Sequence, residues 1–229
     1  MLLKDYFYGF LHRPMKKWTR AGLNELVKAE LQELRPYSTI LSVGGHGPVD
    51  EFLTVMANEN NWTLITLDID PEHSPEILID LSNLTDLSSQ QLPLMDAIVC
   101  IEVFEHVQRI TEAINGIKFR LAPNGKLIAS TPWIIPMHDR PNDFRRFTYE
   151  GIESLLGEFR EIKIIARGNY IDSVIALTLR GTRAGGKAGK FFAVFGVFFA
   201  LLRRNPRIYS QINSREIDSP IGYFFTGKM

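Results

Sequence analysis

The 229-residue sequence has only one cysteine, Cys100, and no net charge, because 26 basic residues balance 26 acidic residues. A single cysteine excludes an internal disulfide framework and any zinc site that needs several cysteines, and we expect no metal site. Cys100 stands in the apolar run "AIVCI", where a free cysteine is typically a small buried hydrophobe. The balanced charge argues against a nucleic-acid-binding protein that relies on a broad positive field.

Long apolar segments are also missing. No stretch reaches the about 20 apolar residues that a membrane-spanning helix needs. The N-terminus mixes charged with apolar residues and lacks the small-residue cleavage site of a signal peptide. Because 45% of the residues are hydrophobic, the chain can still bury one sizeable core. We therefore expect a cytoplasmic protein, and one apolar segment described below leaves open a peripheral position at the inner membrane face.

What the sequence does contain is a regular order of elements. From Arg20 to Leu34 apolar residues recur with helical spacing, and Pro36 follows as a stop signal. Short apolar strands and helices then alternate. The expected strands are 39–43, 63–70, 76–80, 96–104, 126–131, 160–168 and 219–229, and the expected helices are 49–58, 109–122, 148–157 and 191–204. This alternation predicts a doubly wound α/β sheet.

Residues suited to binding a ligand follow three successive strands. They are Gly44, Gly45 and Gly47 after the first strand, Asp68 at the end of the second and Asp80 at the end of the third. In doubly wound sheets ligands bind outside these strand ends, where glycine admits a close approach and a carboxylate can accept hydrogen bonds from ribose hydroxyls. Each feature has an ordinary alternative. The glycines can form a packing turn, Asp70 can replace Asp68, and Asp80 can cap the next turn.

With "MDAIVCIEVFEHV" and "LAPNGKLIASTP" behind them, these strand ends resemble the class I S-adenosylmethionine-dependent methyltransferases over about residues 39–159. "DAIVCIEVFEHV" resembles the fourth motif of that family. "HDRPNDFRRFTYEGIESLL" resembles the segment after the fifth strand in a type 11-like subgroup found with bacterial glycan and cell-surface polysaccharide pathways. The chain departs from the pattern at three positions, since Ser42 replaces an acidic residue and His46 and Pro48 replace two glycines.

The resemblance implies a Rossmann-like fold with a seven-stranded, mostly parallel sheet and a helical insertion before the last strand. It also implies S-adenosylmethionine as cofactor. The implied cofactor-binding residues are Gly44, Gly45, Gly47, Asp68, Asp80, Leu81, Ile101 and Glu102. On this basis we divide the chain into an N-terminal helical segment (1–38), a cofactor-binding methyltransferase core (39–170), and an apolar insertion with the final strand of the same domain (171–229).

Catalytic residues are expected over the carboxyl ends of the fourth and fifth strands. Methyl transfer from a sulfonium is an in-line displacement, and a hydroxyl acceptor needs a general base as well. His138 and Asp143 are the expected catalytic residues, and Glu105 and His106 are further candidates after the fourth strand. A neutral histidine can accept a proton near pH 7. The ordinary alternatives are a surface histidine at 138 and a helix-start residue at 106.

Three residues are expected to bind the acceptor. Arg145 and Arg146 can clamp a phosphate or a carboxylate with their guanidinium groups, or they can form ion pairs with nearby acidic residues. Trp133 can stack on a sugar ring, although a buried aromatic residue is more often part of a core.

The expected function is methylation of a sugar hydroxyl or of another small or lipid-linked polar acceptor. The alternative is a methyltransferase-like binding or scaffold protein that has lost catalysis, consistent with Ser42, His46 and Pro48. A nicotinamide-dependent oxidoreductase would require a cleaner G-x-G-x-x-G pattern.

The segment 191–204, "FFAVFGVFFALLRR", has basic residues on both sides. A helix this apolar is expected to be buried against the domain, to form a homodimer, or to lie on a membrane surface.

Overall fold

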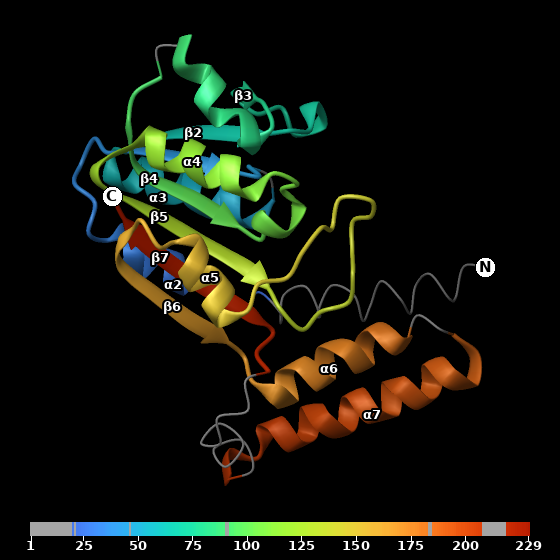
Figure 1. The fold of residues 1–229 in the computed structure, drawn as a ribbon. Helices are drawn as coiled ribbons and strands as arrows, with labels where there is room; N and C mark the ends of the chain where they lie inside the picture. The colour runs from blue at the N-terminus through green and yellow to red at the C-terminus, as the bar shows by residue number, and fades with distance from the viewer. Residues whose placement is uncertain (1–19, 21, 46, 90–91, 183–184, 208–218) are drawn as a thin grey trace. The chain divides into compact units, whose positions relative to one another are not determined.

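The computed structural model describes residues 20, 22–45, 47–89, 92–182, 185–207 and 219–229. His46 and most of the N-terminal segment expected at 1–38 lie outside these residues. Seven strands form one sheet in the order β3-β2-β1-β4-β5-β7-β6 (Figure 1). The strands are β1 (Thr39–Val43), β2 (Thr63–Asp68), β3 (Ile77–Leu78), β4 (Met95–Ile101), β5 (Leu121–Pro132), β6 (Arg160–Arg167) and β7 (Gly222–Lys228).

The sheet is mixed, with most strands parallel. β3, β2, β1, β4 and β5 pair in parallel. β7 runs antiparallel to β5, because the N–H of Asn124 near the start of β5 donates to the carbonyl of Met229 after the end of β7, at 3.1 Å. The other end agrees, since the N–H of Trp133 donates to the carbonyl of Ile221 at 2.7 Å. The predicted doubly wound, mostly parallel seven-stranded sheet is therefore confirmed.

Helices follow most of the strands. They are α2 (Leu23–Leu31), α3 (Pro48–Asn60), η1 (Pro71–His73), η2 (Leu81–Ser89), η3 (Phe104–His106), α4 (Ile110–Arg120), α5 (Tyr149–Leu155), α6 (Tyr170–Gly181) and α7 (Gly186–Arg204). The helices α6 and α7 come between β6 and β7, which confirms the predicted insertion before the last strand. α7 begins at Gly186 rather than at Phe191, so it is longer than the sequence pattern predicted.

One apolar cluster joins α2 and α3 to the sheet. Its members are Leu23, Val27 and Leu31 of α2, Leu53, Met56 and Ala57 of α3, and the strand residues Ile40, Ala97, Val99, Ile128 and Phe224, together with Trp62. The other face of the sheet carries α4 and α5 (Figure 1). Strands covered on both faces read as continuous apolar runs, which is the pattern of β4. Cys100 is fully buried in that strand, as expected.

The chain divides into two compact units. The first, here called the sheet unit, comprises Leu23–Thr131, Asp139–Ile165 and Phe224–Met229. The second, here called the hairpin unit, comprises Pro132–His138, Ala166–Tyr223 and the described residues before Leu23. No helix among the described residues has both the length and the apolar composition needed to cross a membrane. The sequence-based division at residues 38 and 170 stays a prediction.

Candidate active site

The register of the parallel strands places several predicted site residues in one row. Val43 at the end of β1 pairs with Leu67 of β2 on one side and with Cys100 of β4 on the other. The next residue of each strand is therefore Gly44, Asp68 and Ile101, across three neighbouring strands spaced by about 4.8 Å. The strand order reverses at β1 and β4, where doubly wound sheets bind ligands at their carboxyl ends.

The glycines after β1 form a tight turn into α3. Gly44 has φ 72°, and a Cβ atom there would lie 2.9 Å from Cγ2 of Val103. Gly47 has φ 77° and caps α3, but a Cβ atom there would meet nothing within 4 Å. Gly45 is buried against Thr66. Gly44 is thus needed both for its backbone conformation and for its contact, whereas Gly47 is needed for conformation and leaves open space beside the helix N-terminus.

Asp68 ends β2 as a buried carboxylate with two neighbours from its own turn. Its Oδ1 accepts a hydrogen bond from the N–H of Asp70 at 2.9 Å, and its Oδ2 lies 2.9 Å from Nδ1 of His73. Asp70 instead caps η1, because its Oδ1 accepts the N–H of Glu72 at 2.9 Å. Of the two acidic residues, Asp68 is therefore the one that stands at the strand end in the row.

Asp80 has the role of a turn cap. Its Oδ1 accepts a hydrogen bond from the N–H of Ser82 at 2.8 Å, which is the ordinary alternative considered from the sequence. Leu81, the first residue of η2, is almost fully buried. Whether Asp80 and Leu81 also contact a cofactor stays a prediction.

Glu102 follows β4 in a left-handed conformation with φ 57°, which is strained for a residue other than glycine. Hydrogen bonds with Ser130 hold it there. Its N–H donates to the carbonyl of Ser130 at 3.1 Å, and the hydroxyl of Ser130 donates to Oε1 of Glu102 at 2.9 Å. This carboxylate is thus fixed at the carboxyl end of β4, beside Ile101.

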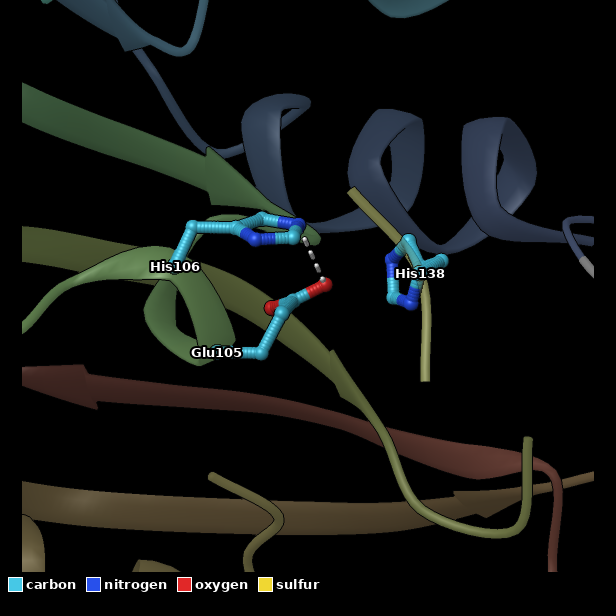
Figure 2. A group of neighbouring side chains, drawn as sticks. All are labelled: Glu105, His106 and His138. Atoms are coloured by element: carbon cyan, nitrogen blue, oxygen red, sulfur yellow. Dashed lines mark ion pairs between the residues drawn. The ribbon is translucent and has the colours of Figure 1, made fainter. Parts of the chain in front are cut away.

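Glu105 is the most deeply buried acidic group near these strand ends, with 0% of its surface exposed. Neither carboxylate oxygen has a hydrogen-bond partner among the described residues, and Oε1 lies 3.7 Å from Nε2 of His106 (Figure 2). Burial, and then the negative charge of Glu102, raise the pKa of Glu105 well above its ordinary value. Glu105 therefore favours its protonated form.

Two hydrogen bonds join the loop 139–146 to η3, one between backbone groups and one from a side chain to the backbone. The N–H of Phe144 donates to the carbonyl of Glu105 at 2.8 Å, and Nδ1 of His106 lies 2.6 Å from the carbonyl of Asn142. Because a carbonyl only accepts, Nδ1 of His106 carries its proton. Arg145 joins the same loop to the chain by donating from Nη2 to the carbonyl of Gln108 at 2.6 Å.

Asp143 and Arg146 form a two-pronged ion pair. Nη1 of Arg146 contacts Oδ1 of Asp143, and Nη2 donates to Oδ2 at 2.8 Å. The hydrogen bonds that Arg146 donates to Asp143 raise the pKa of Arg146 above its ordinary value. The structure thus shows the ion pair that was the ordinary alternative for Arg146, and this pair fixes the position of the Asp143 carboxylate.

His138 and Trp133 belong to the hairpin unit. Both are half-buried, and the N–H of Trp133 pairs with Ile221 as described above. Their expected places beside the acceptor stay predictions.

A family model described as a methyltransferase domain matches residues 15–162, which is more than half of the chain. The chain belongs to the methyltransferase-domain family. This assignment confirms the expectation of an enzyme of the methyltransferase class. No curated protein shows a significant match.

Solved structures show the same fold at low identity. A SAM-dependent methyltransferase from Archaeoglobus fulgidus is 15% identical with a TM-score of 0.54, over 90% of this chain and 94% of that one. The N-methyltransferase NodS from Bradyrhizobium japonicum is 13% identical with a TM-score of 0.51, over 92% and 96%. A phosphoethanolamine N-methyltransferase 2 from Haemonchus contortus is 12% identical with a TM-score of 0.53, over 94% of this chain and 56% of that one.

Three partners in the methyltransferase-domain site were absent from the sequence analysis. They are His73 beside Asp68, Ser130 beside Glu102, and Asp50 in the first turn of α3. Oδ1 of Asp50 is buried and has no hydrogen-bond partner among the described residues, and it lies 3.5 Å from where a Cβ of Gly45 would be. The sequence shows Asp50 as an acidic residue soon after the glycines, but an acidic residue is also common in the first turn of any helix.

Proposed function

We propose that this methyltransferase-domain protein takes its methyl group from S-adenosylmethionine and transfers it to an oxygen of a small or lipid-linked polar acceptor, with a sugar hydroxyl as the expected group. The main support for this cofactor is the row of Asp68, Gly44 and Ile101 at the ends of three neighbouring strands. The Archaeoglobus protein described as SAM dependent and the Haemonchus complex with S-adenosylhomocysteine support the same cofactor.

The residues of the row fit a nucleoside linked to a charged amino-acid tail. Gly44 and Gly47, both with positive φ, leave backbone accessible beside the N-terminus of α3. Asp68 supplies a carboxylate for the ribose hydroxyls, and its contact with His73 would have to make room for them. Glu102, held by Ser130, is a second carboxylate at the neighbouring strand end.

Asp50 can supply the acidic group that is missing at Ser42. An ammonium group needs an anionic acceptor, and Ser42 is a buried neutral residue. Oδ1 of Asp50, which has no hydrogen-bond partner among the described residues, belongs to the first turn of α3 and lies 3.5 Å from where a Cβ of Gly45 would be. We therefore assign Asp50 to the amino group of the cofactor's methionine part.

The acceptor side is proposed from the loop after β5 and from the residues after β4. His138 is the proposed general base, because a neutral imidazole accepts a proton near pH 7. Asp143 is paired with Arg146, so we give it the task of orienting that guanidinium toward a phosphate or carboxylate of the acceptor. Arg145 and Trp133 stay the proposed acceptor contacts. A place in a bacterial glycan pathway rests on the resemblance of residues 138–156.

Calorimetry tests the cofactor directly. S-adenosylmethionine and S-adenosylhomocysteine should bind the full chain, and Asp68→Ala should weaken binding by about 2–4 kcal/mol, since a charged acceptor of two hydroxyls is lost. Asp70→Ala is the matched control, because this neighbouring carboxylate caps η1. No heat with either compound at millimolar concentration would refute the cofactor and favour a non-catalytic binding protein. Equal losses for both variants would show that the ribose is not held by Asp68.

A labelled-cofactor screen tests the acceptor. Sugars and glycolipids should be screened as hydroxyl acceptors. Small amines should be tested in parallel, because the similar NodS and Haemonchus proteins are described as N-methyltransferases. Methyl transfer to hydroxyls, reduced by His138→Ala with cofactor affinity unchanged, is the expected result. Transfer to amines alone would refute the oxygen acceptor and leave the methyltransferase assignment intact.

A further inference from the structure

Exposed apolar side chains line one face of α7. They recur every three or four residues, so they share one side of the helix. The stripe consists of Phe191, Val194, Phe195, Phe198 and Leu201, with exposed fractions between 43% and 67%. A contiguous stripe of large apolar side chains in water marks an interaction surface more often than an ordinary surface. This stripe is called the outer face of α7 below.

The opposite side of α7 is already occupied by α6 (Figure 1). Glycines let the two helices approach closely. A Cβ atom at Gly189 would lie 2.8 Å from the carbonyl oxygen of Thr182, and one at Gly196 would lie 3.2 Å from the side chain of Leu179. The two helices therefore form a tight hairpin in which α6 contacts the glycine side and leaves the outer face to solvent.

The charges of this hairpin have one sign. Between Tyr170 and Arg204 the sequence has one acidic residue, Asp172, and six basic residues, Arg180, Arg183, Lys187, Lys190, Arg203 and Arg204. Asp172 is buried and paired with Arg203, whose Nε lies 2.6 Å from its Oδ1. Lys187, Lys190 and Arg204 are exposed at the two ends of the outer face. In a chain without net charge, this is a local excess of positive charge around an apolar stripe.

We propose that the outer face of α7 docks on an anionic membrane surface. The helix would lie in the plane of the interface, with the stripe at the boundary of headgroups and acyl chains and the basic ends against lipid phosphates. A second copy of the chain fits the same face poorly. Parallel pairing would place Lys187 beside Lys187, antiparallel pairing would place Lys187 beside Arg204, and α7 has no acidic residue to compensate.

Docking does not depend on the proposed function, but it bears on the acceptor. Under the proposed function, a protein bound to the membrane surface would be close to acceptors that are anchored in the same membrane.

Vesicle flotation of the full chain tests the docking. Wild type should float with vesicles of phosphatidylcholine and phosphatidylglycerol, and it should bind those of phosphatidylcholine alone about a hundredfold more weakly, because three exposed basic residues contribute about 1 kcal/mol each on an anionic surface. Phe195→Asp with Phe198→Asp should abolish flotation. Phe198 is chosen because it is exposed, whereas its neighbour Phe199 is half-buried.

The matched control is Val55→Asp with Leu94→Asp, which adds the same charge at two exposed apolar residues of the sheet unit. It should float like wild type, and circular dichroism should show the same fold for both double variants. The proposal is overturned if wild type stays soluble with anionic vesicles, or if the α7 variant floats as wild type does. A wild-type dimer that the α7 variant dissociates, without lipid binding, would assign the face to a second copy. Cofactor binding by calorimetry is read separately, so failure of docking leaves the proposed function untouched.

Discussion

Substituting Gly44 separates two reasons for a glycine at the end of β1. In Gly44→Ala the left-handed φ of 72° costs about 1–2 kcal/mol, since an L-residue has its Cβ close to the following carbonyl. The new Cβ would also lie 2.9 Å from Cγ2 of Val103, well inside ordinary van der Waals contact. Valine is stiff about χ1 and cannot easily move away, so overpacking adds about 1–3 kcal/mol. We expect a total loss of about 2–5 kcal/mol in the free energy of unfolding.

Gly47→Ala is the matched comparison, because its φ is 77° and its Cβ would meet nothing within 4 Å. Its ψ of −158° lies in a region essentially restricted to glycine, so this variant should lose only a conformational part of about 1–3 kcal/mol. Urea unfolding followed by circular dichroism measures both. In a Val103→Ala background, Gly44→Ala should lose only its own conformational part, which gives a coupling energy between Gly44 and Val103 of about 1–3 kcal/mol. No coupling between Gly44→Ala and Val103→Ala would refute the close contact.

Three further predictions concern charged side chains. Asp50→Asn should weaken S-adenosylmethionine binding by about 1.5–3 kcal/mol in calorimetry, since a carboxylate facing an ammonium is lost; an unchanged affinity would remove Asp50 from the site. Glu105 has a pKa raised in the folded state, so its contribution to the free energy of unfolding is greatest at low pH and is lost as pH rises from the ordinary carboxyl range, about 4, through the raised value. Glu105→Gln should flatten this decline in urea unfolding measured across pH, and an unaltered slope would contradict the burial of a titrating group. Lys126 contacts Glu30 at 3.0 Å and Glu33 at 2.7 Å, and Glu30 keeps a second ion pair with Lys163 at 2.9 Å, so Lys126→Met should lower the free energy of unfolding by only about 1 kcal/mol, and a neutral result would show that the Lys126 pairs contribute nothing.

Local sequence patterns determined the fold class and the edge of the sheet at which the candidate site lies. Apolar runs such as 96–104 predict strands covered on both faces, because only a covered strand can be apolar at every position. Their alternation with amphipathic segments predicts parallel pairing, and parallel pairing brings all carboxyl ends to one edge. Gly44 and Asp68 could therefore be placed at that edge from their positions alone.

Contacts between distant residues were decided only by the tertiary structure. The approach of Val103 to Gly44, the burial of Glu105 and the pairing of Glu102 with Ser130 join segments from different strands. No periodicity of 2 or 3.6 residues encodes them, because they depend on the register of the sheet and on how loops return to it. The same holds for α7. Its apolar composition was evident in the sequence, but the glycine contacts with α6 decided which of its side chains face water.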